Sequence, residues 1–238
     1  GLNSKNRALP VEVNGFRPSS YQFNTTQSLQ SFKEGWDVEK ITSLPNTSLS
    51  FTTAQRFKLG ETTNLGVLFS LNQGSSYKYK EGSNNAFRLN GNQIDYNNKL
   101  YKKEYDYDLE SSAILGLGLK NKGTTVNFNA IFLQNSENTI ENQRGFRDGG
   151  QTAPDQFFSV NQQDISRFTN LQLLASQKLG ERHLFKAGGS WVNNFFSQPD
   201  RKIFYGIPTA KENEILLSFG GNNLLRQYLD VQGKNYFS

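Results

Sequence analysis

Apolar and polar residues alternate along most of the chain, which predicts β-strands and little helix. In 47–59 the apolar residues Leu49, Phe51 and Phe57 lie at odd positions, and the even positions are polar or small. Similar alternation recurs in 65–71, 113–119, 126–132, 165–179 and 185–195. We therefore expect three hairpins, near 47–73, 109–134 and 164–196, with one or two further strands in 204–237 and one in 11–42.

The hairpins share an asymmetry. Each closes through a short turn, whereas the segments between hairpins, 74–108 and 135–163, are long and polar. Short turns at one end and long loops at the other are typical of outer-membrane β-barrels. In lipid every backbone group must be paired, so strands cross only as a closed barrel. One apolar row is expected to face the lipid: Leu49, Phe51, Phe57, Leu65, Val67, Phe69, Leu115, Leu117, Phe128 and Phe132.

The composition excludes several classes of function. The chain has no cysteine and one histidine, which excludes thiolate and His-pair metal sites and leaves little general-base chemistry. No apolar run is long enough for a transmembrane helix. The net charge is +5, but the 26 Lys and Arg are interspersed with 21 acids, which argues against nucleic-acid binding. We expect no catalytic residue, metal or cofactor, and therefore not an enzyme.

A soluble fold remains the alternative. A β-sandwich also alternates, with one face of each sheet in a core, and such a module could bind glycans. Segments of about 30 residues between strands are unusual in compact soluble domains, which favours the barrel.

Short motifs near the N-terminus carry a family resemblance. Arg7-Ala8-Leu9-Pro10 is followed by Phe32 and Trp36, then by the run 43–51 (SLPNTSLSF) and the turn Lys58-Leu59-Gly60. This arrangement resembles TonB-dependent outer-membrane receptors of the Bacteroidetes type, from the end of the plug domain into the first barrel strands.

The resemblance implies a location and partners. Residues 1–46 would be the lead-in after the plug together with the first barrel strand or strands, and 47–238 would be barrel hairpins with extracellular loops at 74–108 and 135–163. Because family barrels have more strands, the chain is expected to be part of a larger antiparallel transmembrane barrel in the cell outer membrane. Its partners would be lipid, the plug, the remaining strands, the TonB system and a surface lipoprotein. The implied function is uptake of a bulky nutrient: a glycan, a peptide or a chelate.

Two groups of loop residues are candidates for ligand contact. Glu104, Asp106 and Asp108 share parity with Gly116, and they would face Lys78 and Lys80 across a strand pair in the barrel lumen. They form either a cross-strand charge ladder or a ligand site at the mouth. The second candidate is Arg144, Phe146 and Arg147, which could hold an anionic or sugar ligand. Tyrosines of the opposite parity are expected outward at the membrane interface: Tyr77, Tyr79, Tyr101, Tyr105 and Tyr107.

Overall fold

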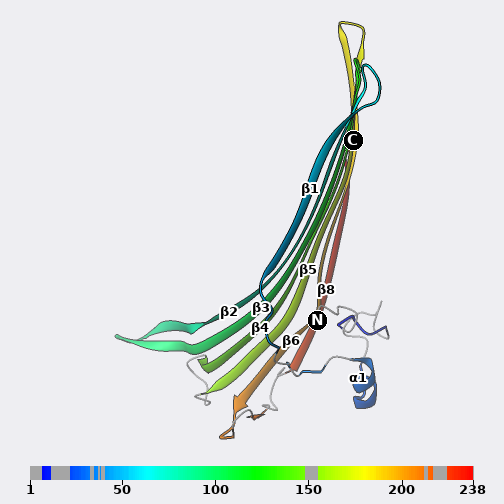
Figure 1. Ribbon diagram of the computed structural model, residues 1–238. Helices are drawn as coiled ribbons and strands as arrows, with labels where there is room; N and C mark the ends of the chain where they lie inside the picture. The colour runs from blue at the N-terminus through cyan, green and yellow to red at the C-terminus, as the bar shows by residue number, and fades with distance from the viewer. Residues whose placement is uncertain are drawn as a thin grey trace.

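The strands form one antiparallel sheet with a short helix beside it (Figure 1). The computed structural model describes residues 7–11, 22–32, 35–36, 38, 41–147, 155–211, 214–216 and 224–237. The elements are α1 (Thr25–Ser31), β1 (Thr47–Lys58), β2 (Asn64–Asn90), β3 (Gln93–Lys120), β4 (Thr124–Arg147), β5 (Gln156–Leu179), β6 (His183–Pro208), β7 (Ile215–Leu216) and β8 (Leu224–Phe237). The expected all-β antiparallel fold is confirmed.

The sheet follows chain order. Its strands lie in the order β1-β2-β3-β4-β5-β6-β7, and β8 pairs with β6. The short turns lie at one end of the sheet, where Leu59 N–H donates to Thr63 C=O at 2.8 Å and Asn121 N–H donates to Thr124 C=O at 2.8 Å. The three expected hairpins are present, and 204–237 adds β7 and β8 as expected.

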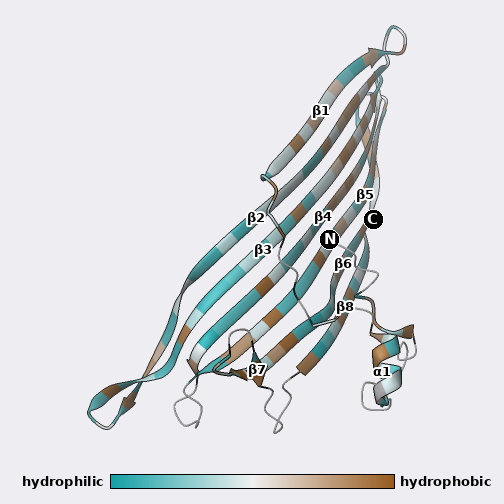
Figure 2. Ribbon diagram, turned by 60° about the horizontal axis from the view of Figure 1, so that its bottom comes forward, coloured by the Kyte–Doolittle hydropathy of each residue, from teal (hydrophilic) through white to brown (hydrophobic). Residues whose placement is uncertain are grey.

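The expectation that 74–108 and 135–163 are loops is wrong for most of their length. β2 continues to Asn90 and β3 starts at Gln93, while β4 continues to Arg147 and β5 starts at Gln156. Residues 148–154 lie outside the described part. The physical reason is that strand pairing does not require an apolar face. Backbone hydrogen bonds between strands continue where both faces of the sheet carry polar side chains and meet water. Figure 2 shows the long β2–β3 hairpin as largely hydrophilic.

Strand register fixes which residues share a face. Val67 pairs with Leu117, and Leu117 pairs with Phe128. All ten residues of the expected outward row lie on this one side, which we call the apolar face. The opposite side, which carries Ser70, Asn72 and Gly118, is called the polar face. The predicted parity is therefore confirmed.

The apolar face is left exposed rather than packed into a core. Leu49 is 74% exposed, Phe51 56% and Leu173 52%. In the described part of the chain, the buried hydrophobic side chains are only Leu100, Val160 and Ile203. Backbone pairing, rather than a buried core, holds this sheet together.

The sheet is not closed. Among the described strands, β1 pairs with β2 alone and β8 pairs with β6 alone, so each has an open edge. No described residue of 11–42 is in a strand, so the strand expected there is not found. That region instead contains α1, because the Asn24 side chain accepts from Gln27 N–H at 2.8 Å and the Gln27 side chain accepts from Asn24 N–H at 3.1 Å, a capping box.

The N-terminal residues pack against the apolar face near the long-hairpin end of β5, β6 and β8. Arg7 donates to Asn161 Oδ1 at 2.9 Å, and Lys202 donates to the carbonyl oxygen of Gly35 at 2.6 Å. Figure 1 shows α1 on the convex side of the bent sheet. In the described residues no helix has the length and apolarity needed to cross a membrane.

Candidate functional site

A charged network occupies the polar face of β2 and β3, beyond the level of the apolar rows. Lys78 lies opposite Asp106 and Lys80 lies opposite Glu104 in the strand register. The predicted placement of these lysines and acids on one face is thus confirmed. An ion pair between Lys102 of β3 and Glu141 of β4 extends the network to a third strand.

The network is made of short ion pairs. Lys80 Nζ lies 2.6 Å from Glu104 Oε1 and 3.0 Å from Asp106 Oδ2, and Lys78 Nζ lies 2.7 Å from Asp108 Oδ2. Lys102 Nζ lies 2.6 Å from Glu104 Oε2. Hydrogen bonds from Lys102 and Lys80 lower the pKa of Glu104 to about 2.

Asp106 is the most deeply placed member of this network. It is 6% exposed, and the hydroxyl of Thr139 donates to its Oδ1 at 3.0 Å. Both carboxylate oxygens of Asp106 are therefore occupied, one by Lys80 and one by Thr139. This geometry is typical of a charge ladder that orders the strands. It is less typical of a cation-binding site, in which the carboxylate oxygens would be unpaired.

Sequence reasoning missed an acidic row that crosses three strands. Asp108 of β3 lies opposite Glu137 of β4, and Glu137 lies opposite Asp164 of β5. Gln198 donates to Asp164 Oδ1 at 2.8 Å. Burial and then the charges of Asp108, Asp106 and Asp164 raise the pKa of Glu137. The three acids come together only through the pairing of β4 with both of its neighbours. The strand register could therefore have revealed this row, whereas no local sequence motif could.

The five tyrosines lie on the apolar face, as predicted. The ring centroids of Tyr77 and Tyr107 are 4.5 Å apart, and those of Tyr79 and Tyr105 are 5.0 Å apart. Tyr101 lies further along the same face and is 45% exposed. These cross-strand pairs stiffen the hairpin beyond the apolar rows.

Arg144, Phe146 and Arg147 do not form one site. Arg144 shares the apolar face with Tyr101, and its guanidinium lies 2.7 Å from the carboxylate of Asp155. Phe146 lies opposite Lys99 and also belongs to the apolar face. Arg147 has the opposite parity, and its guanidinium lies 5.2 Å from the ring centre of Phe158. The two arginines therefore lie on opposite faces, because they are three positions apart along a strand.

A groove of about 820 Å³ runs over the middle of the polar face. Its lining includes Phe168, Phe196, Asn72, Asn135 and Asn194. Aromatic side chains with amides around them can hold a bulky solute that has both apolar and hydrogen-bonding groups. The sequence pattern did not predict this groove, because its residues come from separate strands.

A second charged cluster lies where β6 bulges. Asp200 has a positive φ of 49°, is 0% exposed and accepts from Tyr228 Oη at 3.0 Å and from Arg226 at 3.2 Å. The guanidinium of Arg226 also stacks over Phe32 at 4.9 Å and Trp36 at 5.2 Å. Burial and the charge of Asp200 raise the pKa of Tyr228 to about 12. This cluster attaches the N-terminal segment to the sheet, and we interpret its role as structural.

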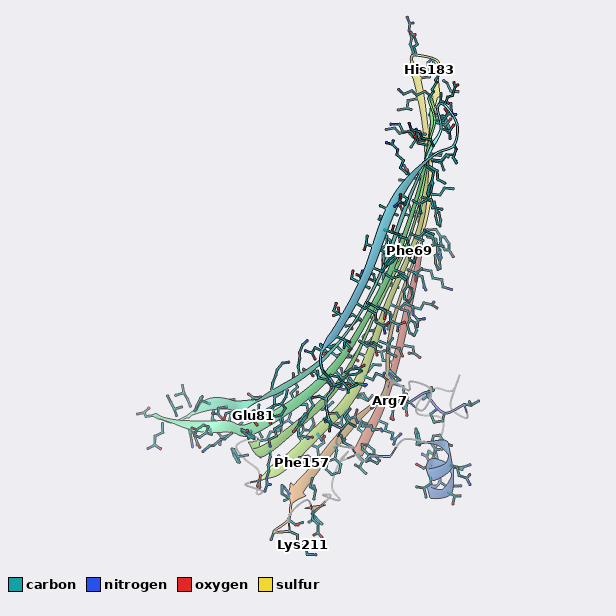
Figure 3. All side chains as sticks on the ribbon, viewed as in Figure 1. Arg7, Phe69, Glu81, Phe157, His183 and Lys211 are labelled. Atoms are coloured by element: carbon teal, nitrogen blue, oxygen red, sulfur yellow. The ribbon has the colours of Figure 1, made fainter. Side chains whose placement is uncertain are left out.

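Within the described residues, no group of three or more His, Asp and Glu is arranged to hold a metal ion. His183 lies at the short-turn end, remote from both charged clusters (Figure 3).

No protein-family model matches the chain, and no curated protein and no solved structure matches it.

Proposed function

We propose that this chain forms part of the wall of an outer-membrane β-barrel, in a TonB-dependent receptor that takes up a bulky nutrient such as a glycan, a peptide or a chelate. The observation that carries the proposal is the exposed apolar face of a sheet with almost no core. In water, an apolar patch of this extent is rare on a monomer. In lipid the same face is buried.

The extent of the apolar rows supports a membrane position. The row on β3 runs from Ala113 to Leu119. The row on β1 runs from Leu49 to Phe57, with Thr53 and Gln55 between its apolar residues. At about 3.3 Å per residue these rows are roughly 20 and 26 Å long along the strands. A strand tilt of about 40° reduces the height that they span across the bilayer to about 15 and 20 Å. The lipid-facing band of an outer-membrane barrel is about 25 Å tall. The rest of each long strand would then stand outside the hydrocarbon.

The soluble β-sandwich is less favoured. A sandwich needs a second sheet packed over the apolar face. The described strands all belong to one sheet, and the described N-terminal residues meet that face near Asn161, Lys202 and Arg226, at the long-hairpin end.

The receptor role comes from the sequence resemblance, and the polar face is compatible with it. The groove lined by Phe168 and Phe196 lies between the charged network and the short-turn end. A ligand that passes the network would reach aromatic and amide groups next. The open edges of β1 and β8 would be joined by further strands, and the plug, TonB system and surface lipoprotein are the partners that the resemblance implies.

The test is the behaviour of the full chain with and without an amphiphile. We expect it to need detergent in gel filtration and to float with neutral phospholipid vesicles after high-salt washing, since hydrophobic insertion resists salt. A monodisperse detergent-free monomer that stays behind in flotation would argue for the soluble alternative.

A further inference from the structure

Basic side chains gather on the polar face at the short-turn end of the sheet. We call this group the basic arc, and its members are Arg56, Lys58, Lys120, Lys178 and Lys186. All are exposed, and none forms a salt bridge within the part of the chain that the structure describes. In Figure 3 the label of His183 locates this end of the sheet. The adjoining turns have no net charge, since they carry two basic residues, Lys122 and Arg182, and two acidic residues, Glu61 and Glu181.

The arc faces away from the side that the apolar rows occupy. Lys120 lies opposite Asn64 and Thr125, and Lys186 lies opposite Ser176, all on the polar face. Lipid headgroups that meet the apolar face would therefore find these lysines turned to the other side of the sheet. The occupant that the charges suit lies over the polar face.

The polar face beside the arc has room for an occupant. Gly66 and Gly118 lie directly opposite each other, and a Cβ at Gly66 would meet nothing closer than 3.7 Å. A groove of about 570 Å³ adjoins the arc and is lined by Lys186, Gln172, Asn127 and Ser190. Backbone from another segment could approach closely at the glycines and hydrogen-bond in the groove.

The spread of the charges indicates the kind of occupant. The arc runs from β1 to β6, five strand spacings, which is about 24 Å at roughly 4.8 Å each. One phosphate or carboxylate cannot span that width. The acidic network on the same face is far away, since Asp106 and Lys120 are 14 residues apart on β3, or about 46 Å at ~3.3 Å per residue. The sheet's own acids therefore do not neutralise the arc.

We propose that the basic arc is a docking surface for an acidic polypeptide segment that lies over the polar face at the short-turn end. The inference rests on the proposed function only for the statement that lipid occupies the apolar face. Complementary charge would guide the segment into register, and the glycines and the groove would let it lie close to the sheet.

The experiment measures binding of a labelled poly-glutamate peptide to the full chain in neutral detergent micelles. The triple variant Lys58→Gln, Lys120→Gln, Lys178→Gln is expected to weaken binding by about tenfold, as three exposed ion pairs would. The matched control Lys99→Gln, Lys103→Gln, Lys234→Gln removes the same charge elsewhere and is expected to change affinity less than about twofold. Raising the salt to about 1 M should weaken wild-type binding by a similar factor, which tests the surface without any substitution.

Three results would overturn the inference. The first is an equal loss in the control variant, which would mean that net charge alone governs binding. The second is displacement of the peptide by inorganic phosphate at the same molar concentration, which would mean a small-anion site. The third is flotation with anionic vesicles that depends on the arc lysines, which would assign the arc to the membrane. The flotation test of the proposed function uses washed neutral vesicles, so either proposal can fail alone.

Discussion

The ammonium of Lys80 lies 2.6 Å from the carboxylate of Glu104, the residue directly opposite it on the neighbouring strand. Lys102, two residues along from Glu104, lies 2.6 Å from its other oxygen. One carboxylate thus joins a cross-strand lysine to a same-strand lysine, and through Lys102 it is linked to Glu141 of β4. The ladder orders the hairpin beyond the apolar rows and sets the charge of the polar face there.

Glu104→Gln is expected to lower the free energy of unfolding by about 0.2–1 kcal/mol for each lost exposed pair at neutral pH. The pKa of Glu104 is lowered in the folded state to about 2, from 4.5. Its stabilisation is therefore present above pH 4.5 and is lost as the pH falls toward 2. Urea unfolding in detergent at pH 7 and near pH 2 measures this, and a difference between wild type and variant that does not shrink at low pH would contradict it.

Glu137→Gln is expected to act in the opposite direction. Burial and the acids on both neighbouring strands raise the pKa of Glu137, so its charged form is disfavoured in the folded state. The penalty is absent below pH 4.5 and develops as the pH rises through the raised pKa. The variant should be more stable than wild type by about 0.2–1 kcal/mol at pH 7 and equal to it near pH 4. Destabilisation at pH 7 would mean that Glu137 holds a partner.

Leu117→Arg and Gly118→Ser compare the two faces at adjacent positions. Leu117 lies in the middle of the apolar face, and a charge there should cost about 2–4 kcal/mol near the bilayer midplane. At Gly118 a Cβ would meet the Asn127 amide oxygen at 3.2 Å, a flexible side chain that can yield. We expect the serine variant to lose much less in the same unfolding titration. Equal penalties would refute the assignment of the faces.

Arg226→Lys tests the attachment of the N-terminal segment. Lysine keeps the charge beside Asp200 but cannot stack as a plane on Phe32 and Trp36, and a desolvated cation–π contact is worth up to about 2 kcal/mol. We expect faster proteolysis in 22–36 while the sheet stays folded. Unchanged cleavage would show that other contacts hold the segment. A variant at an exposed arginine outside the cluster, Arg56→Lys, is the control.

The sequence pattern predicted the strands and their faces because parity is a local property. Leu117 and Gly118, or Tyr105 and Asp106, fall on opposite sides whatever the strand pairs with. That Lys78 and Lys80 share a face with the acids of the next strand also followed from parity and from the adjacency of two consecutive strands. Which lysine lies opposite which acid is known only from the register.

The features that the sequence did not predict depend on pairing between several strands or on local irregularities of a strand. The row Asp108, Glu137 and Asp164 exists only through the register of three strands. Asp200 sits in a bulge that shifts the β6 register by one residue, which no period-two pattern marks. The extent of β2 to β5 was underestimated because polar strands resemble loops in composition.

The position of Trp191 relative to lipid tests the central claim most directly. Trp191 lies on the apolar face beside Leu171, whereas Trp36 lies against Arg226, and these are the two tryptophans of the chain. Trp36→Phe and Trp191→Phe therefore isolate one native probe each. In vesicles with bromine-labelled acyl chains we predict strong quenching of Trp191 and little quenching of Trp36. Trp191 emission that is untouched by the brominated lipid and fully quenched by aqueous acrylamide would contradict a membrane-facing apolar side.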